Sequence, residues 1–176
     1  MFHILSIVKY NFFLGGVFKM KEKYYFAYGS NLNMLQMAKR CPLAKPVGSY
    51  KLKKWKLVFR SVADIEPTVS KGMYLPIGIW KITKKCEDAL DRYEGFPRLY
   101  GKKMFKIKGQ DMMTYIMNSK DIMPPSTDYF NTIAEGYRDF GLDTALLFES
   151  AGWANFVAYN LESKFKSNVS ILNSWS

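Results

Sequence analysis

The 176-residue chain is long enough to bury a hydrophobic core and short enough to form one domain. Apolar residues make up 48% of it and aromatic residues 16%, which excludes an intrinsically disordered chain. Lys and Arg outnumber Asp and Glu by 26 to 15, and the resulting net charge of +11 favours acidic ligands. The lysines are scattered along the chain and form no basic arm, so we expect no nucleic-acid partner.

Histidine and cysteine are rare in this chain, which limits the chemistry of any site. His3 is its one histidine, and Cys41 and Cys86 fit no metal-binding spacing. Histidine-based metal sites and Ser-His or Cys-His catalysis are therefore strongly disfavoured, and acid–base chemistry falls to carboxylates, Tyr or Lys. We expect no metal and no cofactor. Two thiols without a disulfide pattern favour a reducing, cytoplasmic location.

The chain begins with an apolar stretch, residues 1–19, whose uninterrupted runs are too short to cross a bilayer. Met20 resembles a second start immediately before the first strand. We therefore expect 1–19 to be a peripheral or dispensable extension, 20–158 to be the folded domain and 159–176 to be a C-terminal tail. A membrane-surface anchor is the alternative for 1–19; otherwise we expect no membrane partner.

The first predicted strand, Tyr24 to Tyr28, runs directly into Gly29, Ser30 and Asn31. Glycine permits a positive φ or the close approach of a ligand, and Ser and Asn are typical of helix caps. A strand, a small-residue turn and a helix start leave backbone amides free to bind an anion. The turn is therefore a candidate anion site, with an ordinary strand-to-helix connection as the alternative.

Apolar periodicity, Gly, Pro and capping residues locate the other elements. The expected helices cover residues 33–40, 84–92, 128–140 and 143–155, with Thr83 and Ser126 as N-caps. The expected strands cover residues 49–60, 74–83, 100–108 and 112–117, with 64–67 as an irregular extended piece. Residues from about 160 onward show no clear pattern. Consecutive strands with segregated helices predict an α+β fold with a curved or barrel-like sheet.

A second candidate site is the carboxylate of Glu94, which lies at a predicted helix end between Tyr93 and Phe96. A carboxylate among aromatic side chains is desolvated, and its pKa rises towards the range of a general base. An exposed Glu94 paired with Arg92 or Arg98 is the alternative, and Asp91 is the competing carboxylate.

Together, the two stretches resemble signatures of the gamma-glutamylcyclotransferase family, with its AIG2-like and gamma-glutamylamine cyclotransferase relatives. Tyr25 to Leu32 is similar to the signature aromatic-Phe-Ala-Tyr-Gly-Ser-Asn-Leu, and Leu90 to Tyr100 to the signature Leu-Asp-Arg-Tyr-Glu-Gly-x-Pro-x-x-Tyr. Three further segments resemble family segments in the same order: Gly78 to Thr83, Tyr115 to Met117 and Pro124 to Tyr129. The resemblance spans about residues 24–155.

The resemblance implies a small α+β fold, a mixed β-barrel or curved sheet with flanking helices, in which the turn and the glutamate face one pocket. It implies that Glu94 is the catalytic acid/base. The residues that it implies for substrate binding are Tyr25, Phe26, Ala27, Tyr28, Gly29, Ser30, Asn31, Leu32 and Tyr129, with Arg98 and Tyr100 as candidates for contacts to the leaving portion.

The implied reaction is an intramolecular aminolysis by a C–N cleaving enzyme of the lyase or acyltransferase type. The α-amino group of a gamma-glutamyl amino acid, peptide or amine attacks its own γ-carbonyl and yields 5-oxoproline and a free amine, a reaction of glutathione metabolism. The nucleophile belongs to the substrate, which suits a chain with so little histidine. The expected partner is this small substrate, and the expected assembly is a monomer or homodimer.

Three alternatives stay open at this point. The first is a non-catalytic binding module or sequestering protein for a gamma-glutamyl or other anionic metabolite. The second is a related enzyme that removes a gamma-glutamyl group from another amine or acts on a glutamyl-lysine crosslink. The third is nucleic-acid binding through the lysine-rich segment 49–60, which predicts a steep salt dependence of binding.

Overall fold

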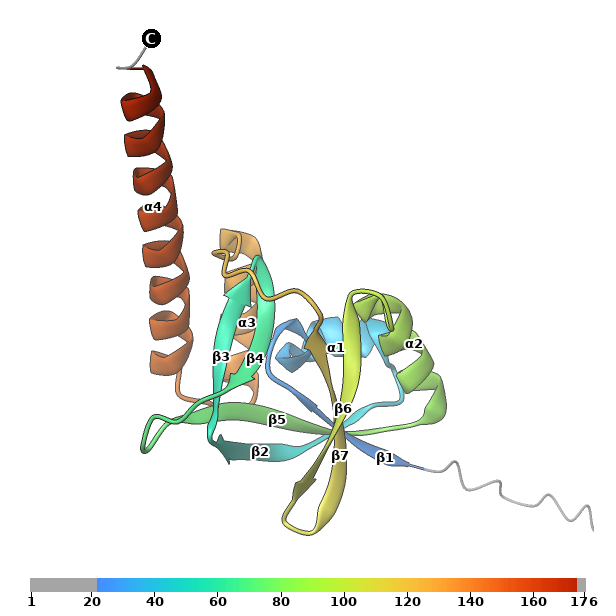
Figure 1. The fold of residues 1–176 in the computed structure, drawn as a ribbon. Helices are drawn as coiled ribbons and strands as arrows, with labels where there is room; N and C mark the ends of the chain where they lie inside the picture. Colours follow the sequence, from blue (N-terminus) through green and yellow to red (C-terminus); the bar gives the residue numbers. More distant parts are fainter. Residues whose placement is uncertain (1–21, 174–176) are drawn as a thin grey trace, which may run out of the picture.

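A computed structural model describes the backbone of residues 22–173 and the side chains of residues 22–163. Within this part, the strands form a five-stranded mixed sheet and a two-stranded sheet, and the helices flank them (Figure 1). The five-stranded sheet has the spatial order β2 (Lys45–Lys53), β5 (Tyr74–Ile82), β1 (Lys23–Ala27), β7 (Gln110–Met117) and β6 (Tyr100–Ile107). The second sheet is the hairpin of β3 (Trp55–Arg60) and β4 (Val62–Pro67). The predicted α+β class is confirmed, with curved sheets that do not close into a barrel.

The helices begin and end largely at the predicted signals. They are the short 3-10 helix η1 (Ser30–Leu32) and the α-helices α1 (Met34–Arg40), α2 (Lys84–Glu94), α3 (Thr127–Asp139) and α4 (Ala145–Asn173). The side chains of Thr83 and Ser126 cap α2 and α3 as expected, because each accepts a hydrogen bond from a first-turn amide. Gly95, in a left-handed conformation with φ 64°, ends α2 immediately after Glu94.

Strand β1 lies at the centre of the five-stranded sheet. It pairs antiparallel with β5, where Tyr25 lies opposite Trp80, and parallel with β7, where Tyr25 lies opposite Met113. Phe26 is fully buried and packs edge-on against Phe105 of β6. Because β1 is covered on both edges, the residues that follow Ala27 leave the sheet from a rigid position.

The single strand expected over residues 49–60 is wrong, and so is the irregular piece at 64–67. Lys54 has a φ of 65° and separates β2 from β3, which belong to different sheets. Residues 62–67 are strand β4, paired in register with β3. The alternation of side chains continues through Lys54, so the sequence pattern does not register the left-handed residue that breaks the strand.

The last helix runs to Asn173 instead of ending near Asn155 as expected. The first part of α4 packs on the body through Leu147, Ala151 and Ala154, all buried. The rest of α4 projects beyond both sheets (Figure 1). Over residues 22–173, no helix is both long and apolar enough to span a membrane. The predicted extension 1–19 lies outside the described residues.

Candidate functional site

A cavity of about 290 Å³ lies where the end of β1 meets β4, β6, β7 and the C-terminal end of α2. The residues that line it are Tyr25, Tyr28, Gly29, Ser30, Asn31, Val62, Ala63, Tyr93, Glu94, Leu99, Tyr100, Tyr115, Met117 and Tyr129. Among these described residues, Glu94 carries the one charged side chain. The two candidate stretches of the sequence thus meet in a single cavity.

The turn after β1 differs in detail from the expected helix start. Gly29 precedes the short helix η1, and the cap of α1 is Asn33, whose side chain accepts a hydrogen bond from the amide of Gln36 at 2.9 Å. Leu32 donates its amide to the carbonyl of Gly29 at 2.9 Å, so the amides of Gly29, Ser30 and Asn31 have no partner within this turn.

Gly29 is explained by close packing and not by a left-handed conformation. Its φ is −115°, which any residue adopts. A Cβ at this position would lie 3.0 Å from the Cβ of Ala63 and 3.3 Å from the hydroxyl of Tyr129. A side chain here would therefore push against strand β4 and helix α3, which form the opposite walls of the cavity.

Asn31 connects the turn to the carboxylate of Glu94. Its Nδ2 donates to Glu94 Oε1 at 2.7 Å and to the hydroxyl of Tyr25 at 2.9 Å. Its backbone carbonyl accepts a hydrogen bond from Trp80 Nε1 at 3.0 Å. Asn31 is 3% exposed, and both ends of the residue are held. The carboxylate of Glu94 therefore has a fixed position beside the turn.

Arg40, on α1, holds the other side of the Asn31 amide. Its Nη1 donates to Asn31 Oδ1 at 2.8 Å and its Nη2 donates to Gln36 Oε1 at 2.6 Å. The guanidinium also lies 3.6 Å from the centre of the Tyr93 ring, a cation–π contact. Because Arg40 can only donate, it directs the oxygen of Asn31 towards itself and the Nδ2 towards Glu94.

Burial raises the pKa of Glu94 from 4.5 to about 7. The hydrogen bond from Asn31 and the positive charge of Arg40 act in the opposite direction and are the weaker influences. Near neutral pH, Glu94 therefore exchanges a proton readily, which suits a general acid or base.

Tyrosine hydroxyls surround Glu94, and several are already engaged. Tyr28 donates to the carbonyl of Tyr115 at 2.7 Å, and Tyr100 donates to the carbonyl of Ala63 at 3.3 Å. The hydroxyl oxygen of Tyr129 accepts a hydrogen bond from the amide of Ala63 at 3.1 Å and keeps its own proton to donate. Burial raises the pKa of Tyr129 to about 12, so this donor persists at neutral pH.

Four of the residues predicted to bind substrate do not line the cavity. Phe26, Ala27 and Leu32 are fully buried, and each side chain belongs to the hydrophobic core. Arg98 is exposed, and its backbone carbonyl accepts a hydrogen bond from Asn118. The other predicted residues, Tyr25, Tyr28, Gly29, Ser30, Asn31, Glu94, Tyr100 and Tyr129, lie together around the cavity.

Other residues of the site were not singled out from the sequence. Tyr93 lines the cavity, and its hydroxyl lies 3.2 Å from Ser30 Oγ. Tyr115 lines it from β7 and packs edge-on against Tyr25. Val62 and Ala63 come from β4, which was not predicted as a strand, so no sequence signal pointed to them. Tyr93 is the residue before Glu94 in the sequence, and this position could have identified it as part of the site.

Asp91, the competing carboxylate, lies outside the lining of the cavity. It accepts hydrogen bonds from the hydroxyl of Tyr115 at 2.5 Å and from Lys102 Nζ at 2.8 Å. One helical turn separates it from Glu94, and these contacts tie α2 to β6 and β7. Its role in this structure is to join these elements, so Glu94 is the stronger candidate for chemistry.

Comparison of the sequence with protein-family models and with curated proteins gives no match. Solved structures share the fold. The structure of a gamma-glutamyl cyclotransferase has a TM-score of 0.64 at 24% identity, and the match covers 74% of this chain and 86% of that one. An uncharacterized protein from Homo sapiens has a TM-score of 0.63 at 26% identity, over 73% and 86% of the two chains. YkqA from Bacillus subtilis has a TM-score of 0.61 at 20% identity, over 76% of this chain and 54% of its own.

Proposed function

We propose that this chain, which has the gamma-glutamyl cyclotransferase fold, converts a gamma-glutamyl amino acid, peptide or amine into 5-oxoproline and a free amine. The observation that carries the proposal is the position of Glu94. Its carboxylate lies in the cavity, 2.7 Å from the Asn31 amide of the turn, and its pKa is raised to about 7. A base and an anion-binding turn in one small cavity are what this cyclisation requires.

In the proposed complex, the α-carboxylate of the gamma-glutamyl group is bound by the free amides of Gly29, Ser30 and Asn31. Amides at the start of a helical turn carry partial positive charge and favour an anion. The hydroxyl of Tyr129 supplies a further donor beside the turn. This placement folds the α-amino group back towards the substrate's own γ-carbonyl and towards Glu94.

The reaction then proceeds through a five-membered ring. The α-amino nitrogen attacks the γ-carbonyl carbon while the carboxylate of Glu94 takes a proton from that nitrogen. The tetrahedral intermediate collapses when the bond from the γ-carbon to the leaving nitrogen breaks, and Glu94 returns the proton to the leaving nitrogen. Acid–base assistance of this kind contributes roughly 10²–10⁴-fold to the rate, and the fixed orientation of the substrate adds to it.

The test is product analysis with purified protein and a panel of gamma-glutamyl dipeptides, gamma-glutamyl amines and glutathione. We expect 5-oxoproline from at least one class, and a kcat/KM that increases with pH through about 7 as Glu94 ionises. Glu94→Gln should lower kcat by roughly 10²–10⁴-fold with a much smaller change in KM, because it removes the acid/base but keeps the size of the side chain.

Asp91→Asn is the matched control, because it neutralises another carboxylate of α2, one that does not line the cavity. It should leave the chemical step largely intact. Equal activity of wild type and Glu94→Gln on every turned-over substrate would overturn the assignment of Glu94. Tight binding of gamma-glutamyl compounds without any 5-oxoproline would instead favour the non-catalytic binding module.

A further inference from the structure

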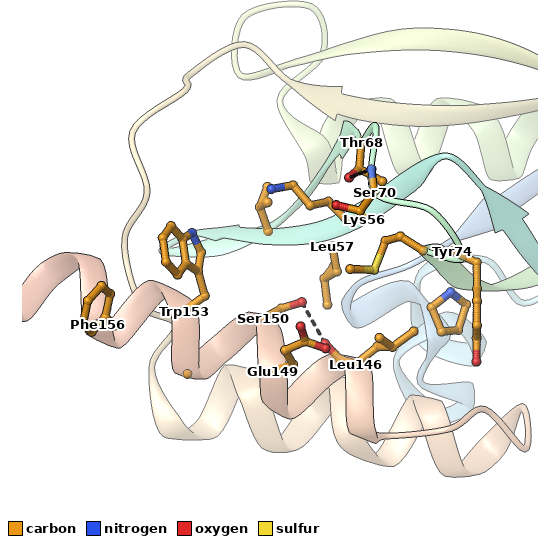
Figure 2. A pocket seen from close by; sticks show the side chains of 14 residues that line it. Lys56, Leu57, Thr68, Ser70, Tyr74, Leu146, Glu149, Ser150, Trp153 and Phe156 are labelled. Atoms are coloured by element: carbon orange, nitrogen blue, oxygen red, sulfur yellow. Dashed lines mark hydrogen bonds between the residues drawn. The ribbon is translucent and has the colours of Figure 1, made fainter.

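A second and larger cavity, of about 580 Å³, lies between α4 and the sheets, away from Glu94 (Figure 2). Its lining residues are Lys56, Leu57, Val58, Thr68, Ser70, Met73, Tyr74, Pro76, Leu146, Glu149, Ser150, Gly152, Trp153 and Phe156. No residue lines both this groove and the Glu94 cavity. Whatever occupies the groove can therefore do so while the other cavity stays open.

Large apolar side chains are exposed at this groove. Trp153 and Phe156 extend from α4 at one end of the groove, and Leu57 points from β3 towards α4 (Figure 2). Their exposed fractions are 52% and 59%, and Tyr159, one turn further along α4, is 72% exposed. An isolated helix is only marginally stable in water, so contact with a partner would stabilise this projecting, aromatic part of α4.

A basic rim adjoins the aromatic residues. A neighbouring hollow is lined by Lys51, Lys53, Lys54 and Lys71, and it shares Thr68, Ser70, Met73 and Tyr74 with the groove. Lys51 and Lys53 lie directly opposite Pro76 and Tyr74 in the pairing of β2 with β5. Side chains of directly opposed residues project from the same face of a sheet, so these lysines face the α4 side.

The loop that joins β4 to β5 places an apolar tip among these lysines. Val69 is fully exposed and lines the same hollow as Lys53, Lys54 and Lys71. The nearby carboxylates do not balance the charge. Glu66 is already paired with Lys56 and Arg60, and Glu149 is the carboxylate that lines the groove.

We propose that this face, formed by the loop 68–73, the lysines beside it and the exposed aromatic residues of α4, docks on an anionic lipid membrane. Lysines next to exposed Trp, Tyr and Phe suit the interface of a bilayer, where aromatic rings lie at the level of the headgroups and lysines meet anionic lipids. Each lysine near such a surface strengthens binding roughly fivefold.

A second copy of the chain is the less suitable partner for this face. Two copies would bring the same lysine-rich rims together, and like charges repel across an interface. The chain as a whole carries a charge of +11, which adds to that repulsion and to the attraction of an anionic membrane. Charge complementarity thus favours an anionic membrane over a second copy of the chain.

The test is co-sedimentation of the full chain with vesicles of phosphatidylcholine alone and of phosphatidylcholine with 30% phosphatidylserine. We expect binding to the anionic vesicles that weakens as salt rises, and little binding to the neutral ones. The double variant Lys53→Glu and Lys71→Glu should lower the partition coefficient at least about 25-fold. Trp153→Ser with Phe156→Ser should also lower it, because the apolar contact with the bilayer is lost.

Lys39→Glu with Lys85→Glu is the matched control, because it makes the same change in net charge on α1 and α2, where both lysines are exposed. This control should keep most of the binding. Equal losses in the two charge-reversal variants, or equal binding to neutral and anionic vesicles, would overturn the proposal. Another outcome is that wild type does not bind vesicles but forms a dimer in sedimentation equilibrium, and that Trp153→Ser with Phe156→Ser dissociates this dimer. That outcome would assign the face to a second copy of the chain.

Discussion

At the scale of single residues, the site depends on how Asn31 and Arg40 hold Glu94. The carboxylate is partly buried among tyrosines, which raises its pKa, while Asn31 and Arg40 stabilise the charged form and limit that rise. Arg40 does not line the cavity, but its positive charge lowers the pKa of Glu94, and it holds the Asn31 amide that donates to Glu94. The proton-exchanging group is thus tuned by a residue outside the cavity.

The raised pKa of Glu94 predicts a pH-dependent stability. Its pKa is about 7 in the folded chain against 4.5 as the ordinary value, so between these values the folded state holds a proton that the unfolded state has lost. The stabilisation of the folded state by the buried neutral carboxyl is fully present below about pH 4.5 and is lost as the pH rises through 7. Relative to Glu94→Gln, wild type should lose ~3 kcal/mol of unfolding free energy between pH 4 and pH 8.5.

Urea unfolding of both proteins across this pH range measures the effect. Glu149→Gln, which removes an exposed carboxylate of α4, controls for the loss of one acidic group. If the difference between wild type and Glu94→Gln were the same at pH 4 and pH 8.5, the carboxylate would not be desolvated in the way that the structure indicates.

At the scale of elements, helix α3 holds the short helix η1 against the sheet. Gly136 lies where α3 crosses η1, and a Cβ at this position would be 2.6 Å from the amide nitrogen of Asn33 and from the Cβ of Leu32. Leu32 also packs over Gly78 of β5. Leu32 therefore fixes the turn by packing. This explains why Leu32 belongs to the sequence signature although it does not line the cavity.

Gly136→Ala should destabilise the chain by about 1–3 kcal/mol, because the added methyl group meets backbone atoms that cannot move aside without shifting the turn. Gly152→Ala is the matched control. Gly152 lies in α4, and a Cβ added there would meet no atom within 4 Å, so its replacement should be neutral or slightly stabilising. Thermal unfolding of both variants compares them, and equal melting temperatures would contradict the tight crossing of α3 and η1.

At the scale of the whole molecule, a buried carboxylate in the β3–β4 hairpin connects the two sheets, and it also forms an ion pair within the hairpin. Arg60 of β3 and Asp64 of β4 are 3% and 0% exposed, and Arg60 Nε donates to Asp64 Oδ2 at 2.8 Å. Asp64 also accepts a hydrogen bond from the amide of Met117 at the end of β7, at 2.9 Å. The hairpin that supplies Val62 and Ala63 to the cavity wall is thereby attached to the five-stranded sheet.

Asp64→Asn should cost about 3–5 kcal/mol of unfolding free energy, because it removes the fully buried one of the two carboxylates that pair with the buried charge of Arg60. Asp111→Asn is the control, since the pair of Lys106 and Asp111 is exposed and 3.8 Å apart, and its loss should cost less than about 1 kcal/mol. Chemical denaturation at one pH measures both values. A cost below about 1 kcal/mol for Asp64→Asn would show that the carboxylate of Asp64 does not hold the hairpin in its place.

Local signals in the sequence predicted much of the fold and the two ends of the site. Capping by Thr83 and Ser126 and the left-handed stop at Gly95 depend on neighbours within one turn, so they could be read from the chain. The strand that leads into Gly29 and the carboxylate of Glu94 were recognised in the same way. The break at Lys54 was missed because the alternation of side chains continues through this left-handed residue. The length of α4 was missed because the part of the helix that projects from the body has no clear pattern of apolar residues.

The sequence by itself determined which groups are available for chemistry: one carboxylate between aromatic residues, a small-residue turn after a buried strand, and almost no histidine. Only the tertiary structure decided that Asn31 turns its side chain to Glu94 and that Arg40 holds it there. The physical reason is distance along the chain, since Asn31 and Glu94 are 63 residues apart and their contact depends on how β1 and α2 pack. The same packing raises the pKa of Glu94, which is a property of its surroundings and not of its neighbours in sequence.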